Sequence, residues 1–238
     1  VIYAAFISLG LPDAILGAAW PSMQPQMAVP VSFAGIISMI ISIGTVVSSL
    51  LSDRLNRKFG TGPVTAVSVF MTAAALFGFS LSGEFWMLCI LAVPYGLGAG
   101  AVDAALNNYV ALHYSSRHMS WLHCFWGIGA SAGPYIMGLC LRSRLGWQSG
   151  YRTIAIAQFI LTAALFFSLP LWKKADKSLK SNNGSSGDNG ADKPVGFISS
   201  VKIRGVPLIM LAFFSYCAFE STAGLWASSY FVSCHGIN

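Results

Sequence analysis

Residues 85–110 read FWMLCILAVPYGLGAGAVDAALNNYV, an apolar run that can cross a membrane as one helix. A spanning helix needs roughly 20 mainly apolar residues. The run carries one carboxylate, Asp103, well inside it. A charge at the centre of a membrane helix costs about 2.5–3.5 kcal/mol on insertion scales, so its presence points to a function.

Six further stretches have the same length and apolar character. The seven predicted spans cover residues 1–20, 32–51, 62–82, 85–110, 119–140, 150–171 and 206–232. Hydrophobic residues make up 55% of the chain and charged residues 9%, far below the roughly 25% charged residues of soluble domains. We therefore predict an all-α membrane protein. Because the chain opens at Val1 inside an apolar run, we expect it to begin within its first helix.

The polar segment 172–204 divides the chain. It is rich in Gly, Ser, Asn and charge, which is typical of a flexible linker. Residues 1–171 then form a six-helix bundle, and residues 205–238 carry the seventh helix. Most Lys and Arg residues lie in this linker and in the gaps that follow the second and fourth spans, so we expect these segments on the cytoplasmic side of a cell membrane.

Three carboxylates lie inside predicted spans: Asp13, Asp103 and Glu220. One such acid could be a protonated structural residue, but three together favour a water-accessible cavity in which carboxyl groups load and release protons. From the predicted helix ends, Asp13 lies about seven residues, roughly 10 Å, inside the outer end of its span, Asp103 lies toward the cytoplasm and Glu220 lies near the midplane. Asn107 follows Asp103 by one helical turn, on the same face, with Asn108 next.

The sequence SDRLNRKFG at 52–60 is predicted to form a short cytoplasmic turn between the second and third spans. By charge alone it could be an ordinary basic loop that fixes topology. Its spacing of Asp53, Arg54, Arg57 and Lys58 resembles the signature loop of the major facilitator superfamily. Ser49 and Asn56 stand where that family commonly has glycine.

Longer stretches resemble the fucose-permease-like sugar/proton symporters of the same superfamily. VDAALNNY matches the fourth helix, LPDAILGAAWPSM the first, WLHCFWGIGASAGP the fifth and FFSYCAFESTAGLWASSY the seventh. The resemblance implies a twelve-helix transporter of two six-helix halves, of which this chain holds the first half, as a 3+3 repeat, with the linker and helix seven. It implies Asp13 and Asp103 as proton-coupling carboxyls, with candidate solute contacts at Asn107, Asn108, His123, Tyr216, Glu220 and Trp226.

The expected function is thus proton-coupled uptake of a sugar or similar small polar solute, which would require the second half of the transporter. A drug/proton antiporter is the nearest alternative, because GIGASAGPYIMG loosely resembles the glycine-rich fifth helix of antiporters. A seven-helix receptor is a further alternative from the number of spans. The coupling ion could be sodium instead of a proton.

Other classes find little support in the residues. No metal-ligand cluster, nucleophile motif or phosphate loop stands in a suitable setting, so we expect no enzyme activity, no cofactor and no metal site. The five cysteines are scattered through apolar segments, and the basic residues sit in short gaps between spans, which argues against nucleic-acid binding. Glycines in GLGAG (96–100) and GIGASAG (127–133) are expected to form close-packing helix surfaces.

Overall fold

The computed structural model describes residues 2–183, 199 and 201–236. Seven stretches in these ranges are helices long and apolar enough to cross a membrane, and the described ranges contain no strand. The prediction of an all-α membrane protein with seven spans is confirmed. The helices are α1 (Ile2–Gly10), α2 (Ile15–Met27), α3 (Phe33–Phe59), α4 (Thr61–Leu81), α5 (Phe85–His113), α6 (Ser116–Arg142), α7 (Gly146–Asn183) and α9 (Val206–His235).

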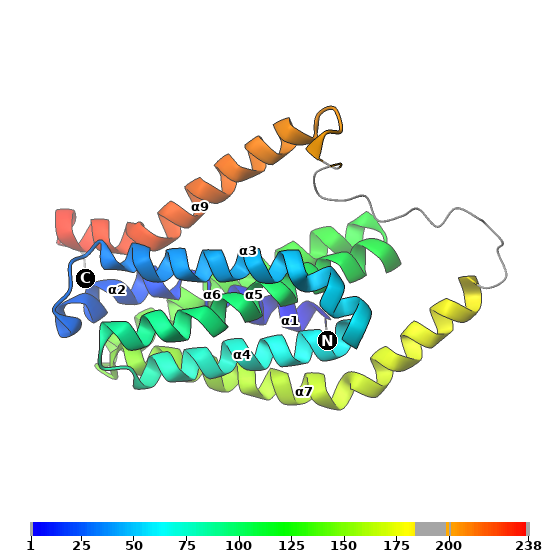
Figure 1. Ribbon diagram of the computed structural model, residues 1–238. Helices are drawn as coiled ribbons and strands as arrows, with labels where there is room; N and C mark the ends of the chain where they lie inside the picture. Colours follow the sequence, from blue (N-terminus) through cyan, green and yellow to red (C-terminus); the bar gives the residue numbers. More distant parts are fainter. Residues whose placement is uncertain (1, 184–198, 200, 237–238) are drawn as a thin grey trace.

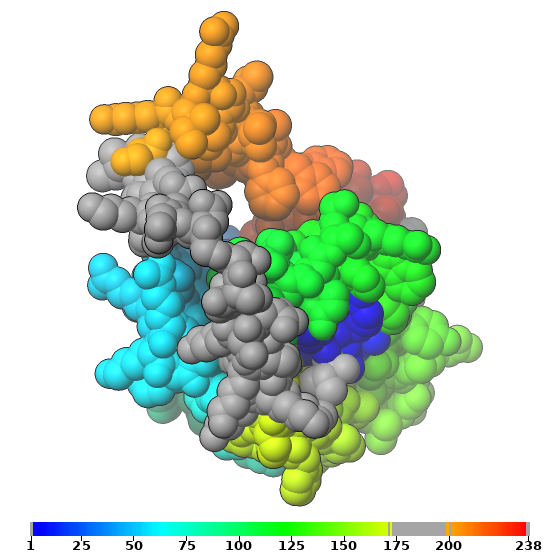
Figure 2. Space-filling view, turned by 90° about the vertical axis from the view of Figure 1, so that its right-hand side faces the viewer, coloured from blue at the N-terminus to red at the C-terminus, as the bar shows by residue number. Residues whose placement is uncertain are grey.

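The spans up to α7 form an up-and-down bundle, because short connections make neighbouring spans antiparallel, and α1 and α2 together make the first span (Figure 1). Helix α5 packs against both α3 and α4, α4 packs against α7, and α1 packs against α6. Helix α9 packs mainly against α2. Its first turns stand away from the bundle, whereas its C-terminal end meets it (Figures 1 and 2).

Close helix packing at glycine is confirmed between α3 and α5. A Cβ on Gly96 would collide with the backbone of Ile41, and one on Gly100 with the backbone of Thr45. The Thr45 hydroxyl lies 3.3 Å from the Gly96 carbonyl, and Ser49 donates to the Gly100 carbonyl at 3.2 Å. Small residues thus let the two backbones approach, and hydroxyl groups hydrogen-bond across the gap.

The same device joins α6 to α1. A Cβ on Gly129 would meet the carbonyl of Ile7, and one on Gly133 would meet the carbonyl of Leu11. Gly127 differs, because nothing lies within 4 Å of where its Cβ would be. The prediction therefore holds for Gly129 and Gly133 and is wrong for Gly127.

The predicted turn at 52–60 is also wrong, because α3 continues through Phe59. Charged residues such as Arg and Lys are good helix formers, and basic side chains in the last turn are favoured by the helix dipole. The first residue that breaks the pattern is Gly60, which has a φ of 86° that ends the helix.

Two predicted span ends move as well. Helix α2 continues through Pro21 to Met27, held by the packing of buried side chains such as Trp20. Helix α7 continues to Asn183, into the segment predicted as a linker. Residues 184–198 and 200 of that segment lie outside the described residues, and the linker stays a prediction.

Candidate functional site

The first span is broken between Gly10 and Ile15, and a proline, Pro12, lies in the break. Helix α1 ends at Gly10, α2 begins at Ile15, and residues 11–14 form turns between them. In a continuous helix the Ser8 carbonyl would accept a bond from the N–H of residue 12, but Pro12 has no N–H. The break therefore leaves a buried carbonyl that needs another partner.

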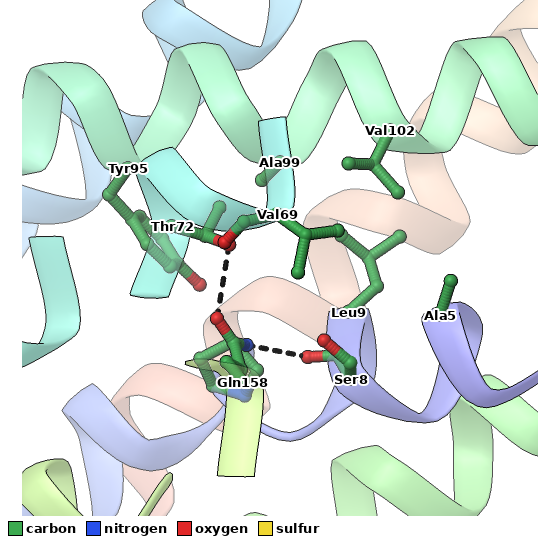
Figure 3. Close-up of a pocket in the computed structure, with 10 residues that line it drawn as sticks. Ala5, Ser8, Leu9, Val69, Thr72, Tyr95, Ala99, Val102 and Gln158 are labelled. Atoms are coloured by element: carbon green, nitrogen blue, oxygen red, sulfur yellow. Dashed lines mark hydrogen bonds between the residues drawn. The ribbon is translucent and has the colours of Figure 1, made fainter. Parts of the chain in front are cut away.

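Gln158 of α7 supplies that partner. Its Nε2 donates to the Ser8 carbonyl at 2.8 Å, and the hydroxyl of Thr72 lies 3.0 Å from its Oε1 (Figure 3). Gln158 is only 1% exposed, so this bridge between α1, α4 and α7 lies in the core. The cavity beside it has a volume of about 10 Å³, room for roughly one water molecule. We call Ser8, Thr72 and Gln158 the brace.

The break places Asp13 in the turn, outside either helix. The Asp13 N–H donates to the Gly10 carbonyl at 3.1 Å, three residues back instead of four. Asp13 is exposed in this chain, and it interacts electrostatically with Glu220 and Asp103. Because α2 runs on to Met27, Asp13 lies 14 residues before the end of the first span, and the predicted position, about seven residues before that end, is wrong.

Asp103 lies half-buried on α5, and Asn107 one turn later donates from Nδ2 to its Oδ1 at 2.9 Å. The other amide atom, Asn107 Oδ1, is buried and has no hydrogen-bond partner within the described residues. His123 of α6 is close enough to Asp103 to interact with it electrostatically, and it packs edge-on against Phe6. On α5 an acid and an amide are thus hydrogen-bonded to each other, and an imidazole on α6 interacts with that acid electrostatically.

Helix α9 brings Glu220 toward the same region. Glu220 is half-buried at the middle of α9 and interacts electrostatically with Asp13. Tyr216, one turn earlier on the same helix, interacts with Glu220 and is 55% exposed. One turn after Glu220, Gly224 lies against Gly17 of α2 so closely that a Cβ on Gly17 would collide with its carbonyl.

The structure therefore brings five of the eight predicted inner residues into one group and leaves three aside, of which Tyr216 is the exposed neighbour of Glu220 on α9. Asp13, Asp103, Asn107, His123 and Glu220 form one group, which we call the acidic cluster. Asn108 is exposed on α5, and Trp226 lies beside Gly35 at the start of α3. The four charged residues at 53–58 are separate, near the far end of α3.

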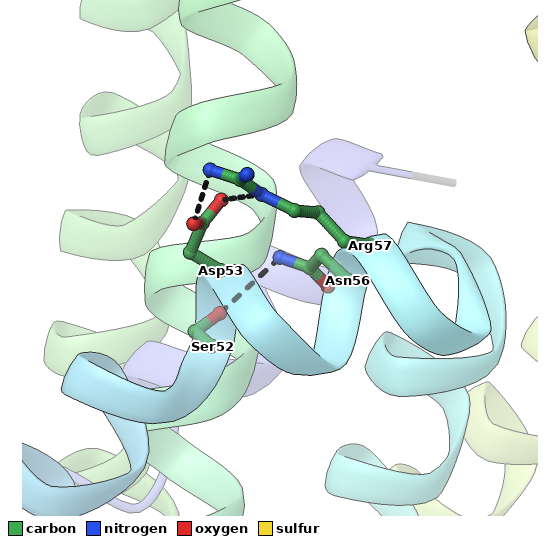
Figure 4. A network of polar contacts seen from close by, with 4 residues as sticks. All are labelled: Ser52, Asp53, Asn56 and Arg57. Atoms are coloured by element: carbon green, nitrogen blue, oxygen red, sulfur yellow. Dashed lines mark hydrogen bonds and ion pairs between the residues drawn. The ribbon is translucent and has the colours of Figure 1, made fainter. Parts of the chain in front are cut away.

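At that end of α3, Asp53 and Arg57 form an ion pair. Their Oδ2 and Nη2 atoms lie 2.6 Å apart, and Nε donates to Oδ1 at 3.2 Å (Figure 4). Asn56 donates to the Ser52 hydroxyl at 3.2 Å on a neighbouring face. Arg54 and Lys58 take part in no ion pair within the described residues, and Lys58 lies 5.2 Å from the ring centre of Phe59.

The brace was not predicted from the sequence. Its signal is Pro12 in an apolar run, which implies an unsatisfied carbonyl four residues earlier. The sequence cannot say which distant polar side chain answers that carbonyl. Gln158 is a candidate donor to that carbonyl, because it is a polar residue inside a predicted span.

Comparison with known proteins covers nearly the whole chain. Residues 2–238 match the family model described as Major Facilitator Superfamily. Synaptic vesicle glycoprotein 2C of Rattus norvegicus is 27% identical over 179 residues, which cover 69% of this chain and 24% of that protein. Bypass of stop codon protein 6 of Saccharomyces cerevisiae is 23% identical over 251 residues, covering 98% of this chain and 50% of that protein. The chain spans about half the length, or less, of these relatives.

Proposed function

Because the chain belongs to the Major Facilitator Superfamily, whose members are membrane transporters, we propose that its acidic cluster couples proton movement to the transport of a small polar solute. The family favours a transporter over a receptor or an enzyme. Our proposal goes further, to uptake of a sugar or similar solute by the cell. The complete protein would supply the second half of the solute site.

The observation that supports this function is that Asp13 interacts electrostatically with two further carboxylates, each from another part of the chain. Asp13 comes from the break in the first span, Asp103 from α5 and Glu220 from α9. No Lys or Arg forms an ion pair with any of them within the described residues. Acids held inside a membrane protein without a cation are expensive, and proton exchange is a function that repays this cost in transporters.

In this proposal Asp13 and Asp103 carry the coupled proton. Glu220, Asn107, Asn108, His123, Tyr216 and Trp226 contribute solute contacts. Asn107 suits a hydroxylated ligand best, because its buried Oδ1 is an acceptor still without a partner within the described residues. The residues at 53–58 would form a gate on the cytoplasmic side, as the family resemblance implies.

Transport by the full-length protein that contains this chain tests the proposal. Proteoliposomes loaded with a pH-sensitive dye would be given an inward proton gradient and a panel of radiolabelled monosaccharides. We expect accumulation of at least one sugar with proton entry. Asp103→Asn should abolish gradient-driven accumulation while allowing solute exchange at equal concentrations. Unchanged accumulation in Asp103→Asn would refute the coupling role.

The direction of transport distinguishes uptake from the antiporter alternative, which the glycine-rich sequence of α6 favours. In right-side-out vesicles a symporter accumulates solute with an inward proton gradient, whereas an antiporter expels it. The same vesicles with a sodium gradient replacing the proton gradient identify the coupling ion.

A further inference from the structure

An apolar groove with a volume of about 440 Å³ runs along the bundle surface between α3 and α4, and none of the residues that line it belongs to the acidic cluster. Its floor is Leu97 and Ala101 of α5. Each wall is a stripe of side chains four residues apart, so each stripe follows one helix face for roughly 12 Å. The walls are Leu51, Leu55 and Phe59 on α3, and Pro63, Val67 and Met71 on α4.

The groove is open to its surroundings. Leu51, Leu55 and Phe59 are 44%, 36% and 56% exposed, and Val67 is 50% exposed. All of them lie on helices long and apolar enough to span a membrane. A lipid acyl chain is therefore expected to fill the groove. A particular lipid would be selected only by polar or charged groups beside it.

Two cations beside the groove supply the selection. Arg54 follows Leu51 by three residues and Lys58 follows Leu55 by three, so both flank the apolar stripe on one side of α3. They are also one turn from each other. Arg57 points its charge to Asp53 instead, which leaves Arg54 and Lys58 without an acidic partner within the described residues.

We propose that this groove is a binding site for an anionic phospholipid. One acyl chain lies between α3 and α4 on the Leu97–Ala101 floor, and the phosphate is bound by Arg54 and Lys58. A transmembrane helix could cover the apolar stripe, but it would pair with both cations only if it carried acidic side chains beside them. A phospholipid with a net negative headgroup satisfies the groove and the charges together.

Binding of phosphatidylglycerol to the purified full-length protein that contains this chain, in detergent, tests this site. Native mass spectrometry and thermal unfolding would be measured with phosphatidylglycerol and, separately, with phosphatidylcholine of the same acyl chains. We expect tighter binding and a higher unfolding temperature with phosphatidylglycerol. Arg54→Gln with Lys58→Gln should weaken phosphatidylglycerol binding by about 30-fold, from roughly 1 kcal/mol per basic residue.

Two further variants separate the headgroup from the chain. Val67→Trp fills the groove and should weaken both lipids. Arg142→Gln with Arg152→Gln removes two exposed charges at the other end of the bundle and should change neither. Equal affinity for the two lipids, or equal loss with both pairs of substitutions, would overturn the proposal. A Val67→Trp variant that unfolds at a lower temperature yet binds phosphatidylglycerol as before would also overturn the proposal. The tryptophan would then displace a protein helix from the groove and not a lipid.

Discussion

The middle of the bundle and the end of α3 both hold charged residues, but they treat them differently. At the end of α3, Asp53 is paired with Arg57 on an exposed surface, where such a pair is worth about 0.3–0.5 kcal/mol. In the middle, Asp13 interacts with both Asp103 and Glu220, and none of the three acids has a Lys or Arg ion-pair partner within the described residues. Charge at the end of α3 mildly supports the fold, whereas charge in the middle opposes it.

The neutral polar groups in the middle behave in the opposite way. Ser8, Thr72 and Gln158 are buried and hydrogen-bonded, so each supports the fold. The middle of the bundle thus holds neutral polar residues that stabilise the fold and acids that destabilise it. Four predictions compare the middle of the bundle with the end of α3.

The largest effect is expected at the α1–α6 contact in the middle. Gly133→Ala would place a methyl group against the Leu11 carbonyl, a backbone atom that cannot move aside, and should cost about 3 kcal/mol of unfolding free energy. Gly127→Ala on the same helix is the matched control, because its methyl group meets nothing and should stabilise α6 by up to about 1 kcal/mol. Equal unfolding midpoints for the two variants in a detergent titration would contradict the packing described here.

Gln158→Leu should come next, with a loss of about 1–3 kcal/mol, because the buried Ser8 carbonyl loses its donor. Pro12→Ala restores an N–H that can reach that carbonyl if the helix closes. We expect the double variant Pro12→Ala with Gln158→Leu to be more stable than Gln158→Leu alone. If the effects of Pro12→Ala and Gln158→Leu on the unfolding free energy were strictly additive, Gln158 would not be compensating for the hydrogen bond that Pro12 removes.

Asp13→Asn should change stability with the opposite sign. Removing a charge that interacts with Glu220 and Asp103 is expected to raise the unfolding free energy by about 1 kcal/mol, less than the full insertion cost because the site is open to water. Thermal unfolding in detergent at pH 7 measures it. A clear loss of stability would mean that Asp13 holds the fold instead.

The smallest effect is expected for Asp53→Asn at the end of α3. It breaks the ion pair with Arg57 and should cost about 0.3–0.5 kcal/mol, less at high salt. Denaturant titrations at low and high salt would resolve the difference. A loss above that of Gln158→Leu would reverse the ranking of the two regions.

The sequence predicts the seven spans well, because apolar length decides membrane helices almost by itself. It also predicts that Asp103 and Asn107 lie one turn apart, and the structure shows them hydrogen-bonded. It fails where tertiary contacts decide. Trp20 packing carries α2 past Pro21, and the partner of the Ser8 carbonyl lies 150 residues away. The prediction of a turn at 52–60 is wrong because Arg and Lys are good helix formers, so α3 continues to Phe59.

The close contact of Gly17 with Gly224 is a point around which α9 can rotate. From Gly224 back to Val206 the helix extends roughly 27 Å, at 1.5 Å per residue. A rotation of about 10° around the glycine contact would move the far end by roughly 5 Å while Glu220, one turn from the pivot, moves by only about 1 Å. The geometry therefore lets the distant end of α9 swing widely while its carboxylate stays beside Asp13.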